Sequence, residues 1–177
     1  MGHLAYVGLG ANLSSPIGKP EETILAAVRD LRPAGSLIAC SSLYRTAPVG
    51  MEEQPRFVNA AVQMETELAP EALLDFLLAV ERSYGRDRQR QLPKGPRTLD
   101  LDLLLMDDLV VRGPRLVLPH PELAVRRFVL APLSEIAPDL RHPVLQATMR
   151  ELLAALPEKG PNHSGAVEKM RSEPAQL

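Results

Sequence analysis

The 177 residues predict one α+β domain, and three observations lead to this expectation. Segments with strand-like and helix-like patterns alternate along the chain, which is typical of mixed folds. Hydrophobic residues make up 45% of the sequence and charged residues 24%, a balance that supports a buried core. Proline and glycine separate the segments. We expect residues 1–157 to form the domain and residues 158–177 to form a polar C-terminal tail.

The first half of the chain predicts three strands and one helix. Residues 3–10 are mostly apolar and end in glycine, which favours a strand. Pro20, followed by two glutamates and by apolar residues at helical spacing, begins a helix that Pro33 ends. Residues 36–44 and residues 57–66 favour strands, and the proline-containing stretch between them favours a loop.

The second half predicts a helix, one long strand with short partners, and two further helices. The helix begins at Pro70 and ends at Gly85, and a basic loop follows it. The other expected elements are a strand over 98–106, its hairpin partner over 109–112, a short strand over 116–118, and helices over 128–136 and 147–156. The whole order predicts a ferredoxin-like βαββαβ core, a mainly antiparallel sheet with helices on one face, and a helical C-terminal extension.

The composition excludes several function classes. The 20 basic and 22 acidic residues give a net charge of −2, which disfavours a general nucleic-acid or membrane-surface binder. Cys40 is the one cysteine, so no intrachain disulfide and no multi-cysteine metal site is expected. The sequence shows neither a signal-peptide pattern nor an apolar run of about 18 residues. We therefore expect a cytoplasmic protein that is a monomer, although a dimer is not excluded.

The clearest chemical signal is GPRTLDLDLLL, over residues 95–105. Side chains alternate along a strand, so Asp100 and Asp102 share one face while the leucines at 99, 101, 103 and 105 share the other. Two neighbouring carboxylates repel each other, and Mg²⁺ relieves that repulsion while leaving positions for phosphate oxygens. The alternative is a solvated strand edge. Because the even positions become apolar after Asp102, we expect a central strand that carries a metal site.

Basic residues gather just before this strand, at Arg86, Arg88, Arg90, Lys94 and Arg97. The common explanation of such a run is a solvated surface. Its position beside two carboxylates favours a second one, in which a flexible loop closes over a polyphosphate and neutralises its charge. Covalent catalysis finds no support, because no nucleophile motif is present and Cys40 lies in an apolar segment.

Two other patterns carry weaker signals. Gly8 and Gly10 suggest a dinucleotide fingerprint, but Leu13 stands where that motif needs its third glycine, and no P-loop motif occurs. His120 lies between two prolines in a rigid turn, where a plain surface imidazole is the alternative to a ligand contact.

Taken together, several segments resemble the 6-hydroxymethyl-7,8-dihydropterin pyrophosphokinases of folate biosynthesis. The matching segments stand in the family's order and cover roughly residues 4–156. They are YVGLGANL (6–13), SSLYRTAPVG (41–50), QPRFVNAAV (54–62), residues 81–88, GPRTLDLDL (95–103), LPHP (118–121) and RRFVLAPLSEIAP (126–138).

The resemblance implies a transferase that moves the β,γ-pyrophosphoryl group of ATP to the hydroxymethyl oxygen of the pterin and releases AMP. It implies in-line attack on the β-phosphorus without a covalent intermediate, with a pair of Mg²⁺ ions held by Asp100 and Asp102. The implied catalytic residues are Arg86, Arg88 and Arg97. The implied ATP-binding residues are Glu81, Arg86, Arg88, Arg97, Leu103, His120 and Arg126.

For the pterin, the resemblance implies a slot between two aromatic rings with polar groups at its edge. The implied residues are Thr46, Pro48, Val49, Phe57, Asn59 and Phe128. Phe57 and Phe128 would stack on the bicycle, whereas the alternative makes them ordinary core residues. Two other functions stay open: a ferredoxin-like regulatory domain that binds a nucleotide or amino acid without chemistry, and a nucleic-acid binder that uses the basic loop.

Overall fold

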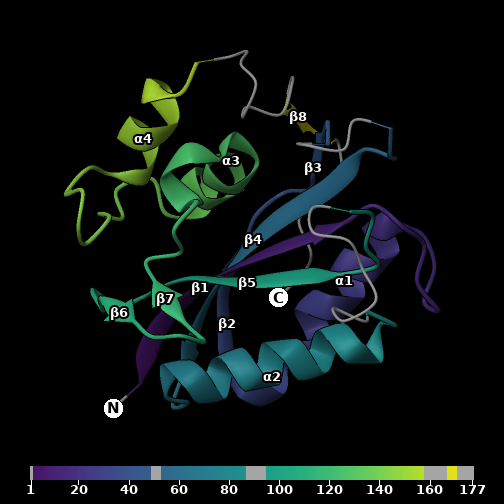
Figure 1. Cartoon of the computed structure of the whole chain (residues 1–177), viewed down its shortest axis with the longest axis horizontal. Helices are drawn as coiled ribbons and strands as arrows, with labels where there is room; N and C mark the ends of the chain where they lie inside the picture. The colour runs from purple at the N-terminus through teal and green to yellow at the C-terminus, as the bar shows by residue number, and fades with distance from the viewer. Residues whose placement is uncertain (1, 49–52, 87–94, 158–166, 171–177) are drawn as a thin grey trace.

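The computed structural model describes residues 2–48, 53–86, 95–157 and 167–170, and Figure 1 shows how their elements are arranged. The strands are β1 (His3–Ala11), β2 (Ser36–Cys40), β3 (Tyr44–Thr46), β4 (Phe57–Thr66), β5 (Asp100–Met106), β6 (Val111–Arg112), β7 (Val117–Leu118) and β8 (Glu168–Lys169). The helices are α1 (Pro20–Asp30), α2 (Pro70–Ser83), α3 (Arg127–Ile136) and α4 (Met149–Ala155), with 3-10 turns at Arg32–Ala34 and Leu123–Val125. The chain is thus a mixed α/β protein, as predicted.

Six strands form one sheet in the order β5-β1-β4-β3-β8, and β2 also pairs with β4. Every pairing in this sheet is antiparallel. The single strand predicted over residues 36–44 is wrong, because β2 and β3 are separate and pair with different parts of β4. Between them, the Ser41 hydroxyl accepts the Ala61 N–H at 2.9 Å, so a side chain replaces a backbone acceptor and interrupts the strand.

The chain also leaves the sheet earlier than predicted after β5. Residues 109–112 were expected to pair with the long strand, but β6 pairs with β7 in a separate two-stranded sheet. Asp107 causes this departure, since it has a positive φ of 49° and its carboxylate accepts the Leu4 N–H at 2.8 Å. That contact holds Asp107 beside the start of β1, where the chain turns away from the sheet after β5.

The sheet separates two hydrophobic cores. One core lies between the sheet and the helices α1 and α2, and the other lies between the opposite face and the helices α3 and α4 (Figure 1). The register of β1 and β5 shifts between Tyr6 and Val7, which marks a β-bulge near Leu104. Because of the bulge, Leu104 and Leu105 both face the α3 core, so the prediction that Leu105 joins Leu101 is wrong.

The long strand β5 lies at one end of the sheet, so the expectation of a central strand is wrong. Its residues are nevertheless apolar because helices cover both faces. Polar groups engage its outer edge: the Leu101 N–H donates to Glu81 Oε1 at 2.8 Å, and Leu104 O accepts the His120 N–H at 2.8 Å. The sequence could not distinguish a covered edge from a central position.

Helix starts follow the sequence signals closely. Pro20 and Pro70 occupy the first turns of α1 and α2, with glutamates beside them, as predicted. The last helix begins at Met149 because Thr148 is its N-cap and accepts the Glu151 N–H. In the expected tail, β8 pairs with β3, and the Met170 N–H donates to Leu43 O at 2.8 Å. Among the described residues, no helix has the length and hydrophobicity that a bilayer crossing requires.

The hydrophobic core between the sheet and the helices α1 and α2 should contribute most to the stability of the fold. Leu101 is 1% exposed, and truncation there leaves a cavity between β5 and the α1/α2 layer. We expect Leu101→Ala to lower the free energy of unfolding by about 2–5 kcal/mol in urea denaturation. The exposed Val110 is the control, and Val110→Ala should change it by less than about 0.5 kcal/mol. Equal effects of the two variants would contradict the assigned burial.

Candidate active site

An open cavity of about 710 Å³ lies on the α3 side of the sheet. Strands β1, β4 and β5 supply its floor, and the first turn of α3 and the end of β3 supply walls. The structure brings eight of the predicted site residues together here: Thr46, Phe57, Asn59, Arg97, Asp100, Asp102, Arg126 and Phe128. Residues separated by up to 82 positions therefore meet in one place, which the sequence alone did not establish.

The two aspartates share one face of β5, as the alternation predicted, and both line the cavity. Asp100 receives two guanidinium groups, one on each carboxylate oxygen: Arg86 Nη1 at 2.5 Å and Arg97 Nη1 at 2.8 Å. Within the parts of the chain that the structure describes, no cluster of three or more His, Cys, Asp or Glu could hold a metal. The site therefore offers a carboxylate pair, which suits Mg²⁺ when a ligand supplies further oxygens.

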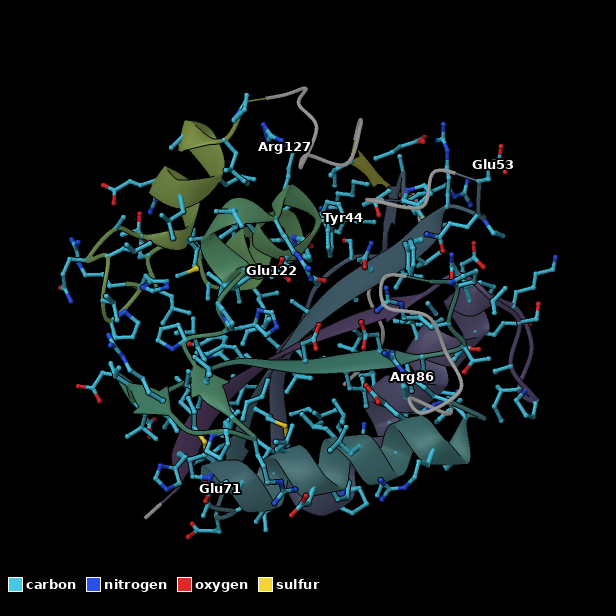
Figure 2. All side chains as sticks on the ribbon, viewed as in Figure 1. Tyr44, Glu53, Glu71, Arg86, Glu122 and Arg127 are labelled. Atoms are coloured by element: carbon cyan, nitrogen blue, oxygen red, sulfur yellow. The ribbon has the colours of Figure 1, made fainter. Side chains whose placement is uncertain are left out.

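Arg86 differs from its predicted setting on a flexible segment. Its side chain is only 9% exposed and does not line the cavity. Besides Asp100, it donates to Leu99 O at 2.8 Å, and its Nε lies 3.7 Å from Glu81 Oε2. In this structure Arg86 fixes the end of α2 to the start of β5 (Figure 2).

Other predicted contacts of ATP and of the pterin lie outside the cavity lining, and the predicted ATP contact His120 is one of them. Glu81 is 1% exposed and accepts the Leu101 N–H, so it supports β5 from the α2 side. The Leu103 side chain packs into the α1/α2 core, on the face of β5 opposite the aspartates. Pro48 is described but does not line the cavity. Arg88 and Val49 lie outside the described residues.

Arg97 is held by a residue that the sequence analysis did not assign. Asn12 is 3% exposed, its Oδ1 accepts the Arg97 N–H at 2.8 Å, and its own N–H donates to Arg97 O at 3.0 Å. The Asn12 amide also donates to Pro55 O at 3.0 Å. One buried asparagine thus joins the end of β1, the segment before β4 and the segment before β5. The sequence feature that could have identified Asn12 is a polar residue directly after an apolar strand.

Two glycines form part of the floor, and their role was also missed. A Cβ atom on Gly10 would lie 3.0 Å from Asn59 Oδ1, and one on Gly8 would lie 3.3 Å from Leu104. Both residues line the cavity. Glycine at these two positions therefore keeps the β1 part of the cavity floor free of side chains.

The two aromatic rings lie at the cavity and outside both buried cores. The Arg97 guanidinium lies 5.2 Å from the centre of the Phe57 ring, and that of Arg126 lies 5.5 Å from the centre of the Phe128 ring. The alternative of ordinary core residues is therefore wrong for both rings. Between them, Asn59 is 6% exposed and donates to Thr46 Oγ1 at 2.7 Å. The cavity thus combines flat apolar surfaces with an amide at their edge.

His120 adds a neutral imidazole near the Arg126 guanidinium group. Burial lowers its pKa, and the nearby positive charge of Arg126 lowers that pKa further. Its Nδ1 accepts the Glu122 N–H at 3.2 Å, which places the ring proton on Nε2. Asp100 acts on the same pKa in the opposite direction. The lowered pKa keeps the ring uncharged near neutral pH.

Comparison with known proteins indicates one enzyme family. The profile of the 7,8-dihydro-6-hydroxymethylpterin-pyrophosphokinase family matches residues 6–138. A 2-amino-4-hydroxy-6-hydroxymethyldihydropteridine pyrophosphokinase of Pseudomonas aeruginosa is 46% identical over 157 residues, covering 88% of this chain and 93% of the relative. The enzyme of that name from Methylorubrum extorquens is 44% identical over 158 residues, covering 88% and 95%.

The fold has solved counterparts as well. A crystal structure of wild-type Plasmodium falciparum HPPK-DHPS aligns with a TM-score of 0.69 at 15% identity. The alignment covers 87% of this chain and 44% of that longer chain, so this chain spans less than half of it. The fold, the matched profile and the two relatives agree, and the chain belongs to the 7,8-dihydro-6-hydroxymethylpterin-pyrophosphokinase family of enzymes.

Proposed function

We propose that this chain transfers the pyrophosphoryl group of ATP to the hydroxymethyl oxygen of 6-hydroxymethyl-7,8-dihydropterin, with release of AMP. The observation that carries the proposal is the convergence of a carboxylate pair, two arginines and two aromatic rings on one cavity. The names of the relatives support the same substrate class. The strand order, with α1 and α2 on one face, supports a ferredoxin-like core.

The charge balance of the cavity supports a requirement for Mg²⁺. Among the described lining residues, Asp100 and Asp102 cancel the charges of Arg97 and Arg126. The triphosphate of ATP therefore needs further positive charge, which the aspartates would supply by holding a pair of Mg²⁺ ions. Held by Asp100 and Asp102, the metal would supply positive charge to the phosphates and would lower the pKa of the attacking hydroxyl group.

The arginines and His120 serve the phosphates in this proposal. Arg97 and Arg126 already face the cavity, and both guanidinium groups can turn from the aromatic rings toward phosphate oxygens. Arg86 and Arg88 complete the set that the family resemblance implies. Direct transfer without a covalent intermediate is the mechanism that the family resemblance implies. Catalysis then consists of positioning and charge neutralisation.

The pterin fits the apolar half of the cavity. Phe57 and Phe128 would stack on its two faces, as flat heterocycles prefer. Asn59 and Thr46 would bind its polar edge, because an amide both donates and accepts hydrogen bonds. Backbone groups near Pro48 and Val49 would complete this edge.

The metal pair gives the first functional test. We expect Asp100→Asn and Asp102→Asn each to lower AMP formation from MgATP and pterin by at least about 10³-fold, through lost charge stabilisation. The matched control is Asp108→Asn, because Asp108 is exposed and lies just past the same strand. Near-normal Mg²⁺-dependent turnover in either site variant would refute the metal assignment. Pterin binding without any AMP formation by the unaltered protein would favour the binding-domain alternative.

The aromatic slot gives the second functional test. Phe128→Ala should weaken pterin binding by about 1–3 kcal/mol in calorimetry, since a stacking partner and its buried area are lost. The affinity for a non-hydrolysable ATP analogue should change much less. Phe76, which packs against the α1/α2 core, is the control, and Phe76→Ala should lower stability while leaving pterin affinity intact. A parallel loss of both ligands in Phe128→Ala would indicate a general packing role.

The titration of His120 gives a third test. Burial lowers the pKa of this ring below its ordinary value in the free protein. We expect its NMR signals to titrate below about pH 6.5, and MgATP to raise this pKa because phosphates favour the charged imidazole. The effect on stability has a definite sign: the unfolded chain binds the proton more readily, so His120 makes stability fall as the pH drops below about 6.5. A pKa that MgATP leaves unchanged would remove His120 from the phosphate site.

A further inference from the structure

A second charged cluster lies outside the cavity and has no part in the proposed chemistry. Its centre is Glu135 near the end of α3, whose Oε1 accepts the Ser42 hydroxyl at 2.9 Å and the Ser42 N–H at 3.2 Å. Its Oε2 accepts the Tyr44 hydroxyl at 2.5 Å. The helix α3 is thereby fastened to β3 and to the residues just before it. Figure 2 shows Tyr44 between these two elements.

The C-terminal strand joins the same cluster. Lys169 of β8 lies opposite Tyr44 in the β3–β8 register, and its Nζ is 3.4 Å from Glu135 Oε1. Strand β3 is therefore bound on one edge by β4 and on the other by β8. None of Ser42, Tyr44, Glu135 and Lys169 lines the cavity.

The cluster holds a fixed negative charge. Burial by itself raises the pKa of Glu135, but the hydrogen bonds from Tyr44 and Ser42 outweigh it, so the pKa is lowered. A carboxylate that accepts three hydrogen bonds and an ion pair is strongly restrained in position. This restraint acts between α3 and β3, which are distant in the sequence.

The same two elements carry opposite walls of the cavity. Tyr44 precedes Thr46 by two residues on β3, so both side chains leave the same face of the strand, about 6.6 Å apart. Glu135 follows Phe128 by seven residues on α3, so both lie on the same face of the helix, about 10 Å apart. Helix α3 and strand β3 therefore face each other at two places. They touch at the Glu135–Tyr44 contact, and they face each other across the cavity at Phe128 and Thr46.

We propose that Glu135, Tyr44, Ser42 and Lys169 form a positioning cluster that sets the distance between Phe128, which would stack on the pterin, and Thr46, which would bind its polar edge. Glu135 is a positioning residue, because it acts through the placement of Phe128 and Thr46 and does not touch the ligand space. This inference rests on the proposed function, since it assigns the slot between those walls to the pterin. Loosening the cluster should weaken pterin binding and raise its KM, whereas kcat at saturation and ATP affinity should be retained.

A pair of tyrosine variants tests the proposal. Tyr44→Phe removes the hydroxyl that bridges α3 and β3. Tyr84→Phe removes a similar bond, from Tyr84 OH to Asp30 Oδ2 at 2.6 Å, which joins α2 to α1 on the other side of the sheet. Both variants lose one hydrogen bond to a carboxylate, so both should lower the melting temperature. Only Tyr44→Phe should raise the pterin Kd, by about tenfold, and the Kd of a non-hydrolysable ATP analogue should stay within about twofold.

A charge reversal on the surface repeats the test without removing a buried group. Lys169 is 57% exposed, and Lys169→Glu would place a second negative charge beside Glu135. It should raise the pterin Kd by about threefold or more through repulsion. The control is Glu168→Gln on the neighbouring position of β8. This side chain points to the other side of the strand, and its neutralisation places no like charge opposite Arg45, so the Kd should stay unchanged.

The outcomes separate the two proposals. A pterin Kd that rises in Tyr44→Phe and Lys169→Glu, but in neither control, supports the positioning cluster. Unchanged pterin Kd in both cluster variants overturns it, even if their melting temperatures fall, because that pattern shows a purely structural role. If the unaltered protein binds no pterin, the proposed function itself fails and the cluster's role fails with it.

Discussion

The carboxylate of Asp100 is the constraint around which the site is organised, because two arginines from different parts of the chain converge on it. Arg86 comes from the end of α2 and Arg97 from the segment before β5. Through Arg86 the network reaches Glu81, which supports the outer edge of β5. Through Arg97 it reaches Phe57 and the buried Asn12. Desolvated ion pairs need this full set of partners, since a buried charge without them is costly. The same pairs fix the direction of each side chain before any ligand arrives.

The features that the sequence predicted well are those that depend on local periodicity. Alternation along a strand placed Asp100 with Asp102, and the bounds of β4 are confirmed as predicted. Proline signals placed the starts of α1 and α2. The predictions that were wrong concern features that depend on contacts between distant segments. The bulge near Leu104, the edge position of β5 and the burial of Arg86 all arise from neighbours that no local pattern specifies. The roles of Asn12, Gly8 and Gly10 were missed for the same reason.

One face of the sheet mainly stabilises the fold, and the other face carries the cavity. The α1/α2 face is a continuous apolar layer, whereas the α3 face gives way to charged and aromatic side chains where the cavity opens. Because successive residues of one strand serve both faces, β5 contributes Leu101 and Leu103 to the core and Asp100 and Asp102 to the site. Core packing on one side thus limits how far the carboxylates on the other side can shift.

The edges of β3 and β5 bear on how the protein behaves at high concentration. An open strand edge offers a row of free amides and carbonyls to any neighbouring chain, and it is a common starting point for aggregation. Here the edge of β3 is covered by β8, and the edge of β5 is engaged by Glu81 and the His120 N–H. Removing the last residues for crystallisation or fusion would uncover β3. The C-terminal strand therefore shields backbone groups that a shortened chain would expose to its neighbours.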